Sequence, residues 1–508
     1  QKTIFRADGT RLPITIKGSS DRAAFTLNIT ADTKVACANS YTFEDLTFPI
    51  GDTTKNTYLF AGSGMVRLEN VATGSKVVGK MSGDNFTARA FDGWTADHVA
   101  ANAYTGNTNT YSSPKVLTSL TIGNDVVYVH DATKCNTAAV QDSGGWETYS
   151  GVTLTPADIV AEIVLDGGRV GDFSGRVGTS PVAESIQRVE RGTIAGSYFA
   201  SSGNFVNATA YADRTHYTGN ITVIVNGGTI EKSTRLLHTA QVNGNYKLYF
   251  NGGTFGSYVQ VGYGENVITG DYELNITGGS YNDTANGFYA HPSARIEGKS
   301  VVNISGGTFK HWFRGTHSRP YDEDGNTTKI DSIEINVMPN AKSSALDPVF
   351  ESNFYGAYKT GGEAGSYVGT MTIRISGGTF NGFVTNSHTD DVGSITNIVS
   401  GGTFNGAFYP GKVTYAGVID SMSNTVTGGT FNGAFYGCGQ YNGASEGNPY
   451  PLVTNEISGG TFNGSIKVAD AYTNTDAIEI SGGTFDEAVS EEYCAEGYIP
   501  TKNTDGTY

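Results

Sequence analysis

Ile-Ser-Gly-Gly-Thr-Phe-Asn-Gly, residues 375–382, decides the fold, because close copies of this phrase recur through the second half of the chain. The phrase returns in full at 457–464, and at 480–487 it ends in Asp486-Glu487. The glycine pairs of all copies begin at Gly227, Gly252, Gly278, Gly306, Gly377, Gly401, Gly428, Gly459 and Gly482. Most intervals are between 23 and 31 residues. A period in that range indicates a solenoid.

Two columns of apolar residues keep their register through the copies. Two residues before each glycine pair stand Val225, Phe250, Ile276, Ile304, Ile375, Val399, Val426, Ile457 and Ile480. Three residues after the first glycine stand Ile230, Phe255, Tyr281, Phe309, Phe380, Phe404, Phe431, Phe462 and Phe485. Stacked coils place equivalent residues above one another, so both columns are predicted to be core. The alternation before the glycines is typical of short strands.

Asparagine follows the aromatic residue in four copies, and glycine follows the asparagine. These asparagines are Asn381, Asn405, Asn432 and Asn463. An Asn-Gly corner on each coil would let equal side-chain amides bond along the stack. In an isolated sheet Asn-Gly would indicate a hairpin. Because the aromatic column keeps its register over coils of unequal length, we predict a parallel β-helix instead.

Two wide gaps in the repeat each contain a degenerate coil. Between Gly306 and Gly377, the run Ser332–Asn336 repeats the strand pattern, with Val337 and Met338 predicted in place of the glycines. Before Gly227, the run Arg191-Gly192-Thr193-Ile194 is a degenerate Gly-Gly-Thr-Phe. The solenoid is therefore expected to continue through both gaps.

Composition fits an all-β chain with three parts. Glycine makes up 68 of 508 residues, about twice the usual share, and charged residues are 16%. We predict an irregular N-terminal β-rich region with early coils and a cap at 1–150, β-helix repeats at 151–490, and a C-terminal cap or following segment at 491–508. Only short helices are expected, after Thr95 and after Ser180-Pro181.

The phrase Ile-Ser-Gly-Gly-Thr-Phe-Asn-Gly resembles the glycine-rich repeat of large secreted or surface-attached proteins of anaerobic gut and rumen bacteria. The wider resemblance, over residues 160 to 490, is to the right-handed pectin-lyase-like β-helix. It implies a fold that hosts polysaccharide lyases, hydrolases, adhesins and passive stalks, so it does not select one function.

Departures from the repeat mark the candidate functional residues. Eleven residues after the first glycine of successive coils stand His238, Tyr263, Tyr289, His317, Pro348 and His388. Eight residues after it stand Arg235, Gln260 and Arg314. If the register holds, these residues line one exposed face. Tyrosine rings accept sugars and arginine matches carboxylate or sulfate, so a carbohydrate-binding face is one interpretation. Packing between surface strands is the other.

Catalysis would need a base, for which His238, Arg314, His317 and His388 are the candidates. The loop Lys310–Asn326 adds Trp312 to the predicted carbohydrate-binding residues, since it mixes this aromatic side chain with both charge signs. Asp322 and Asp324 in the same loop are candidate calcium ligands, although a solvated turn explains them as well. No other metal or cofactor is predicted.

Four cysteines are too few for a disulfide framework. Cys438 and Cys494 lie about two coils apart and are expected to be unpaired. Cys37 and Cys135 could pair within the N-terminal region.

Partners follow from charge and hydropathy. A net charge of −16 without a basic block argues against a nucleic-acid partner. The sequence contains no apolar run of 18 residues, so no membrane span is predicted. We therefore predict an extracellular structural or adhesive β-helix of a bacterial surface or matrix protein, binding polysaccharides or host or matrix glycans along one face, with self-assembly as a further possibility. The alternative is a polysaccharide lyase or glycoside hydrolase, although no Gly-His-Gly or Arg-Ile-Lys motif is present.

Overall fold

The chain forms a parallel β-solenoid of about nine turns in a computed structural model. The structure describes residues 13–18, 35–36, 40–48, 60–61, 65–73, 79–82, 85–88, 119–122, 127–128, 135–140, 148–149, 152–153, 160–170, 172–176, 183–202, 215–263, 266–292, 294–317, 329–358, 367–386, 391–413, 419–437, 440–441, 452–467 and 478–508. Within these residues the helices are too short and too polar to cross a membrane. The chain divides into two compact units, 1–249 with 253–256 and 268–270, and 250–252 with 257–267 and 271–508.

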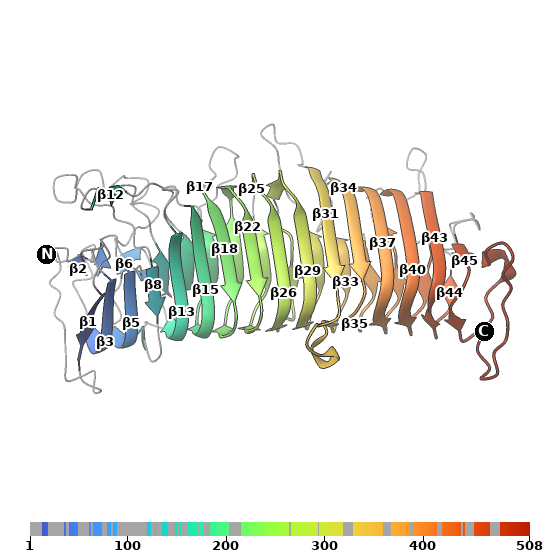
Figure 1. The fold of residues 1–508 in the computed structure, drawn as a ribbon, viewed down its shortest axis with the longest axis horizontal. Helices are drawn as coiled ribbons and strands as arrows, with labels where there is room; N and C mark the ends of the chain where they lie inside the picture. Colours follow the sequence, from blue (N-terminus) through green and yellow to red (C-terminus); the bar gives the residue numbers. More distant parts are fainter. Residues whose placement is uncertain are drawn as a thin grey trace. The chain divides into compact units, whose positions relative to one another are not determined.

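Unit 1 contains two main parallel sheets (Figure 1). The first pairs, in order, β1 (Pro13–Lys17), β3 (Ser40–Phe48), β5 (Met65–Thr73), β8 (Ser119–Ile122), β13 (Val160–Val170), β15 (Glu184–Ile194) and β18 (Asn220–Val225). The second pairs β7 (Asn85–Ala88), β10 (Cys135–Val140), β14 (Asp172–Arg176), β16 (Tyr198–Ser202) and β20 (Thr234–His238). The other strands are β2 (Val35–Ala36), β4 (Phe60–Ala61), β6 (Gly79–Ser82), β9 (Val127–Tyr128), β11 (Thr148–Tyr149), β12 (Val152–Thr153), β17 (Thr215–Thr218), β19 (Thr229–Ile230), β21 (Ala240–Asn243), β22 (Tyr246–Phe250) and β23 (Thr254–Phe255).

Two predictions about unit 1 are resolved by strand β15. Ile194 aligns with Ile230, which confirms that Arg191–Ile194 is a degenerate copy of the repeat. The predicted helix after Ser180-Pro181 is wrong, because β15 begins at Glu184. The alternating burial of Ser185, Gln187 and Val189 shows that tertiary packing outweighs a favourable helix start here. The helix expected after Thr95 lies outside the described residues.

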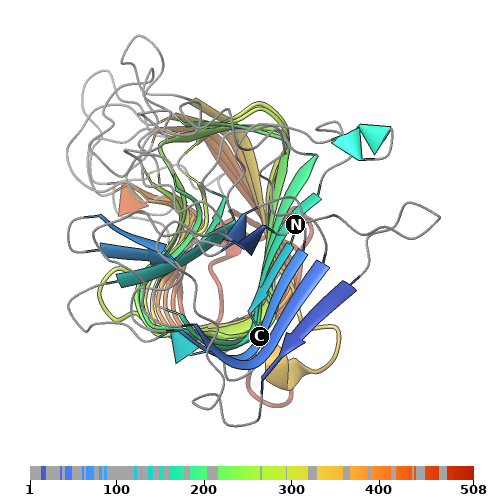
Figure 2. The same cartoon turned by 90° about the vertical axis from the view of Figure 1, so that its left-hand side faces the viewer.

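Unit 2 also has two main sheets, whose strands superimpose in the view of Figure 2. The first contains β26 (Tyr272–Tyr281), β29 (Ser300–Phe309), β31 (Lys329–Val337), β32 (Val349–Phe350), β34 (Tyr367–Ile375), β35 (Thr379–Phe380), β37 (Asp391–Phe404), β40 (Ile419–Phe431), β43 (Leu452–Phe462), β45 (Ile478–Ile480) and β46 (Thr484–Phe485). The second contains β24 (Val259–Tyr263), β27 (Phe288–Tyr289), β30 (Phe313–His317), β33 (Phe354–Tyr358), β36 (Val384–Thr385), β38 (Phe408–Tyr409), β41 (Phe435–Tyr436) and β44 (Ile466–Lys467). The remaining elements are β25 (Asn266–Ile268), β28 (Ala294–Ile296), β39 (Lys412–Val413), β42 (Gln440–Tyr441) and the 3-10 turns η5 (Ser344–Leu346) and η7 (Glu491–Tyr493).

Both predicted core columns are confirmed. Every residue of the Ile/Val/Phe column is at most 4% exposed. In unit 2 the aromatic column forms what we call the inner ladder, whose rings stack 4.6–5.0 Å apart with planes within 11°. Its members are Tyr281, Phe309, Phe350, Phe380, Phe404, Phe431, Phe462 and Phe485. Burial of so many rings in one register fixes the alignment of successive coils.

The glycine pair is required by the close approach of successive coils, as Gly428 and Gly429 show. A Cβ on Gly428 would lie 2.4 Å from the carbonyl oxygen of Ser400 on the preceding coil. Gly429 has φ +100, a conformation that L side chains rarely adopt. Larger residues at either position would therefore push two coils apart.

The degenerate coil between Gly306 and Gly377 is complete, but its register differs from our prediction. Val337, not Ile335, aligns with Ile304 and Ile375 in the core column. A slip of two residues keeps the same side chains inward, so alternation alone could not fix the register. The position of the aromatic column is taken by Phe350, after an insertion that contains η5.

Asparagine ladders run along the coils, and a part-buried one joins Asn275, Asn303 and Asn336 at 2.9 Å. On the outside, Nδ2 donates to the preceding Oδ1 at 2.7–2.8 Å through Asn381, Asn405, Asn432 and Asn463, as predicted. Inside the core, Asn386, Asn397, Asn424 and Asn455 form another ladder at 2.5–2.6 Å. The last three of these stand four residues before a glycine pair, where other copies carry an apolar residue.

The C-terminal residues hydrogen-bond to the last coil. Tyr508 and Phe485 exchange two backbone bonds of 2.8 Å, and the Ala495 amide donates to Ile480. Cys494 is a free thiol, as expected. Cys37 and Cys438 lie outside the described residues, so the proposed Cys37–Cys135 pair is not tested.

Candidate functional site

A second repeated phrase, phenylalanine followed by tyrosine, occupies the second sheet of unit 2. It occurs at Phe288-Tyr289, Phe354-Tyr355, Phe408-Tyr409 and Phe435-Tyr436. Each of these phenylalanines is at most 1% exposed. Since successive side chains of a strand point to opposite faces, each tyrosine lies on the outer face.

Register places these outer residues in one row. Gln260, Tyr289, Arg314, Tyr355, Thr385 and Tyr409 align across β24, β27, β30, β33, β36 and β38. Tyr436 aligns with Lys467. Trp312 and Phe383 directly precede β30 and β36, and Tyr358 ends β33. We call the following nine residues the outer stripe: Tyr289, Trp312, Arg314, Tyr355, Tyr358, Phe383, Tyr409, Tyr436 and Lys467.

One end of the outer stripe is a pair of stacked tyrosines. The rings of Tyr409 and Tyr436 lie 4.5 Å apart with planes at 14°. Phe383 meets Tyr409 edge-on at 6.1 Å, and the Lys467 Nζ lies 5.9 Å over the Tyr436 ring. Burial, and then the neighbouring Tyr436, raise the pKa of Tyr409. Both tyrosines are half-buried, so part of each ring faces solvent.

The middle of the outer stripe is a cluster of aromatic rings. Tyr355 lies 4.7 Å from Tyr358 and 5.9 Å from Trp312. Asn353 Nδ2 donates to the Tyr355 hydroxyl at 3.1 Å. Burial raises the pKa of Tyr355, and this hydrogen bond offsets part of the rise. Trp312 and Tyr358 are half-buried, whereas Tyr355 is 3% exposed.

Arg314 lies among these rings. Its guanidinium carbon is 4.4 Å from the Tyr289 ring centre, 4.9 Å from Trp312 and 4.3 Å from Tyr358. The residue is only 3% exposed, and its buried Nε and Nη1 have no hydrogen-bond partner. Arg314 also takes no part in the ion pairs of the described residues. Among the described residues, the charge is thus held by aromatic faces and by a hydrogen bond with the Tyr289 side chain, and not by a carboxylate.

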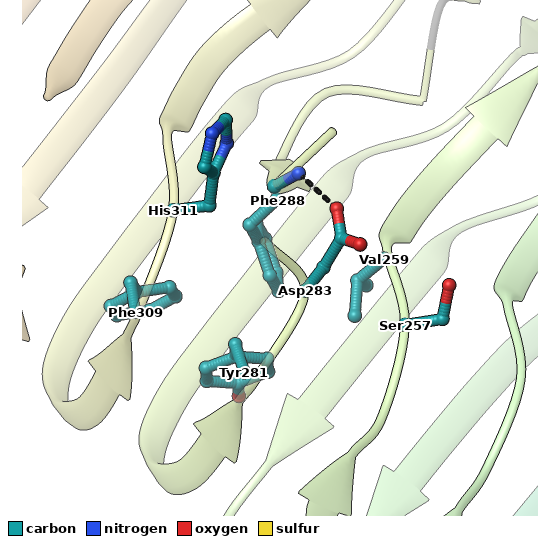
Figure 3. Close-up of a pocket in the computed structure, with 8 residues that line it drawn as sticks. Ser257, Val259, Tyr281, Asp283, Phe288, Phe309 and His311 are labelled. Atoms are coloured by element: carbon teal, nitrogen blue, oxygen red, sulfur yellow. Dashed lines mark hydrogen bonds between the residues drawn. The ribbon is translucent and has the colours of Figure 1, made fainter. Parts of the chain in front are cut away.

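A small pocket beside the stripe is lined by Ser257, Asp283 and His311, with Tyr281 and Phe309 beneath (Figure 3). Its enclosed volume is about 10 Å³, which is room for about one water molecule. Asp283 accepts the Asn286 and Gly287 amides at 2.5 and 2.6 Å, so it holds a turn. Burial lowers the pKa of His311, and Asp283 opposes this effect. The pocket therefore does not offer a sugar-sized site.

Three of the predicted carbohydrate-binding residues come together: Tyr289, Trp312 and Arg314. The predicted column that joined Tyr263, Tyr289 and His317 is wrong. Tyr289 aligns with Gln260 and Arg314, and His317 aligns with Tyr358. The turn that Asp283 holds lies in a segment that is three residues longer than its equivalent in the next coil, so Tyr289 stands eleven residues after Gly278 while Arg314 stands eight after Gly306. Tyr263 is 47% exposed and lies off the stripe register.

Five aromatic residues of the outer stripe escaped our sequence reasoning: Tyr355, Tyr358, Phe383, Tyr409 and Tyr436. The signal was present, because Tyr409 and Tyr436 stand eight residues after Gly401 and Gly428, at the same offset as Arg314. Each of these two tyrosines is also preceded by phenylalanine, so the Phe-Tyr phrase itself repeats. The histidines, in contrast, are too few to define a column.

In unit 1, the candidates Arg235 and His238 both lie on β20. His238 is 9% exposed, so the expected exposed position is wrong. Burial, assisted by the charge of Arg235, lowers the pKa of His238 to about 4. The imidazole is therefore neutral at pH 7.

The remaining candidates cannot be placed. His388, Asp322 and Asp324 lie outside the described residues, and for His317 only the backbone is described. Among the residues that are described, no group of three or more His, Cys, Asp or Glu side chains could hold a metal ion.

The chain matches no protein-family model, no curated protein and no solved structure. The fold and the outer stripe are therefore the basis for a functional proposal.

Proposed function

We propose that this chain is a non-catalytic β-solenoid that binds glycan chains along the outer stripe of unit 2. The observation that supports this proposal is a row of half-buried aromatic rings on strands held in register by a buried ladder. Aromatic faces provide large contact area at low conformational cost. Rings on a sheet are already ordered before binding, so little further entropy is lost.

An elongated ligand suits this arrangement better than a compact one. The rings follow one another from β27 to β41, whereas the enclosed space of the pocket beside them, about 10 Å³, holds about one water molecule. A polysaccharide would contact several rings at once, each contributing a small amount. The Tyr409–Tyr436 end suits the faces of neutral sugars, because tyrosine rings are uncharged and Lys467 is the one charged residue of the outer stripe at that end.

We further propose that the chain acts outside the cell, as a stalk or adhesin of a bacterial surface or matrix protein. The glycine-rich, weakly charged composition supports this idea, as does a repeat that builds length. Polysaccharide cleavage remains the alternative function. Its candidate base Arg314 lies in the outer stripe, but it is 3% exposed and stacked on aromatic rings, and none of the nine residues is a carboxylate or histidine.

The experiment is retention of the whole chain on immobilised polysaccharides, with affinities from titration calorimetry. The panel is dextran, hydroxyethyl cellulose, galactomannan, xylan and alginate. We expect Tyr409→Ala/Tyr436→Ala to weaken binding at least tenfold, since one aromatic contact is worth about 1 kcal/mol or more. Tyr498→Ala is the matched control, because Tyr498 is 54% exposed in the C-terminal segment and off the stripe.

Two results would count against the proposal. The first is no retention of the wild-type chain on any polysaccharide of the panel. The second is equal weakening by the double variant and by Tyr498→Ala. Release of unsaturated uronate or of new reducing ends during the same incubations would favour the cleavage alternative.

A further inference from the structure

We infer that the outer stripe selects glycans that carry an anionic group, and that Arg314 is the residue that determines this selectivity. The inference rests on the proposed function, since it assigns a ligand class to the same stripe. It starts from the one cation of the stripe that is almost fully buried.

Arg314 is a buried charge without a counter-ion among the described residues. A buried cation is costly unless it is paired and hydrogen-bonded. The rings of Tyr289, Trp312 and Tyr358 supply part of the compensation. Nevertheless, the N–H donors at Nε and Nη1 remain without acceptors. This imbalance would be relieved by an anion supplied from outside.

The charge can act on a ligand without becoming exposed. Tyr289, Trp312 and Tyr358 are half-buried, so a ligand that contacts their outer faces lies one ring away from the guanidinium. Attraction across an apolar layer is stronger than across water, and salt screens it less. An anionic sugar on these rings is therefore favoured over a neutral one.

The rest of the molecule works against anions, which makes the inference specific. The net charge is −16, so a polyanion is repelled by the chain as a whole. Among the described residues, Asp283 is a carboxylate close enough to influence the pKa of both Tyr289 and His311, but its Oδ2 is engaged by two backbone amides. A preference for anions would thus have to come from a local site.

Carboxylate and sulfate share the required charge, and the experiment separates them. The probes are two series on constant backbones: dextran, carboxymethyl dextran and dextran sulfate, and hydroxyethyl cellulose, carboxymethyl cellulose and cellulose sulfate. The measured quantity is the ratio of the affinity for each anionic derivative to that for its neutral parent. We expect the wild-type chain to show a ratio of about ten in 50 mM salt.

Arg314→Met keeps the length of the side chain and removes the charge, so the ratio should fall to one or below. Arg314→Lys keeps a charge and should retain a ratio of at least three. Arg374→Met is the matched control, because it removes the same charge from an exposed residue of the first sheet that pairs with Glu334. It should leave the ratio unchanged.

The outcomes distinguish the two proposals. Retention of the neutral parents with a ratio near one, or equal effects of Arg314→Met and Arg374→Met, would overturn the role of Arg314 and leave glycan binding in place. Failure of the wild-type chain to bind any probe would overturn both. If Arg314→Met loses the neutral parent as well, the ratios of the wild-type chain and Arg314→Lys in 50 and 500 mM salt decide. A ratio that stays above one in 500 mM salt supports the inference, because salt screens a buried charge less, and a ratio that falls to one in 500 mM salt contradicts it.

Discussion

The inner ladder and the outer stripe of unit 2 both consist of aromatic residues, yet they differ in almost every other respect. The inner ladder repeats phenylalanine in parallel stacks and is at most 6% exposed. The outer stripe mixes tyrosine, tryptophan, arginine and lysine in stacked, tilted and edge-on contacts. Packing demands identical partners on every coil, whereas a surface row is free to vary. That variation is where a ligand preference can arise.

The largest effect expected from this comparison follows from breaking the inner ladder. Phe404 is fully buried and stacks at 4.9 Å on Phe380 and at 4.7 Å on Phe431. Phe404→Ala should lower the free energy of unfolding by about 3–5 kcal/mol, because it leaves a cavity between two coils. Urea denaturation followed by circular dichroism measures the change. A loss below 1 kcal/mol would show that the coils do not depend on this column.

The next effect concerns pH and strand β20. His238 has a pKa of about 4 when folded and about 6.5 when unfolded, so between these values the unfolded chain binds a proton that the folded chain does not. Stability should therefore be highest above pH 6.5 and fall as the pH drops toward 4, by about 2–3 kcal/mol.

His238→Gln should remove this slope, so the difference between wild type and variant isolates it from the titration of carboxylates. Hydrogen exchange of the β20 amides at pH 7, 6 and 5 is the measurement. Parallel curves for the two proteins would contradict the low pKa.

The buried and the outer asparagine ladders give a matched comparison of inside and outside. Asn424 and Asn432 each donate to one neighbouring amide and accept from another at 2.6–2.7 Å, but Asn424 is 1% exposed and Asn432 is exposed. Asn424→Ala should cost about 2 kcal/mol, because it leaves buried amides without partners. Asn432→Ala should cost about 0.5 kcal/mol, since water replaces the lost bonds. Equal costs in urea denaturation would mean that burial is not the deciding factor.

The smallest expected effect on stability is at the outer stripe. Tyr436→Ala should lower the free energy of unfolding by less than about 1 kcal/mol, because a half-buried ring on one face loses only one stacked neighbour. The same denaturation assay checks it beside Phe404→Ala. A cost as large as that of Phe404→Ala would make the stripe part of the core and weaken its role in binding.

The sequence predicts the core well because each column is repeated many times. A copy that departs from the pattern can still be aligned through the other copies. Ile194, for example, stands in the column where most copies carry an aromatic residue. Prediction fails where a coil departs from the rule. In the degenerate coil, Val337 takes the core position through a two-residue slip that alternation cannot detect. The buried Asn424 was missed because a polar residue in a core column has no signature until its neighbours are placed.

The sequence by itself determined the parallel coils, the stacked phenylalanines and the Asn corner, because these depend on residues at a constant offset from the glycine pair. Only the tertiary structure decided the outer stripe. The segment between the glycine pair and the stripe is three residues longer in the coil of Tyr289 than in the coil of Arg314, and the rings around Arg314 come from β27, from β33 and from the residue that precedes β30. The burial of the Arg314 charge depends on all of these rings together, so it cannot be predicted from any single copy of the repeat.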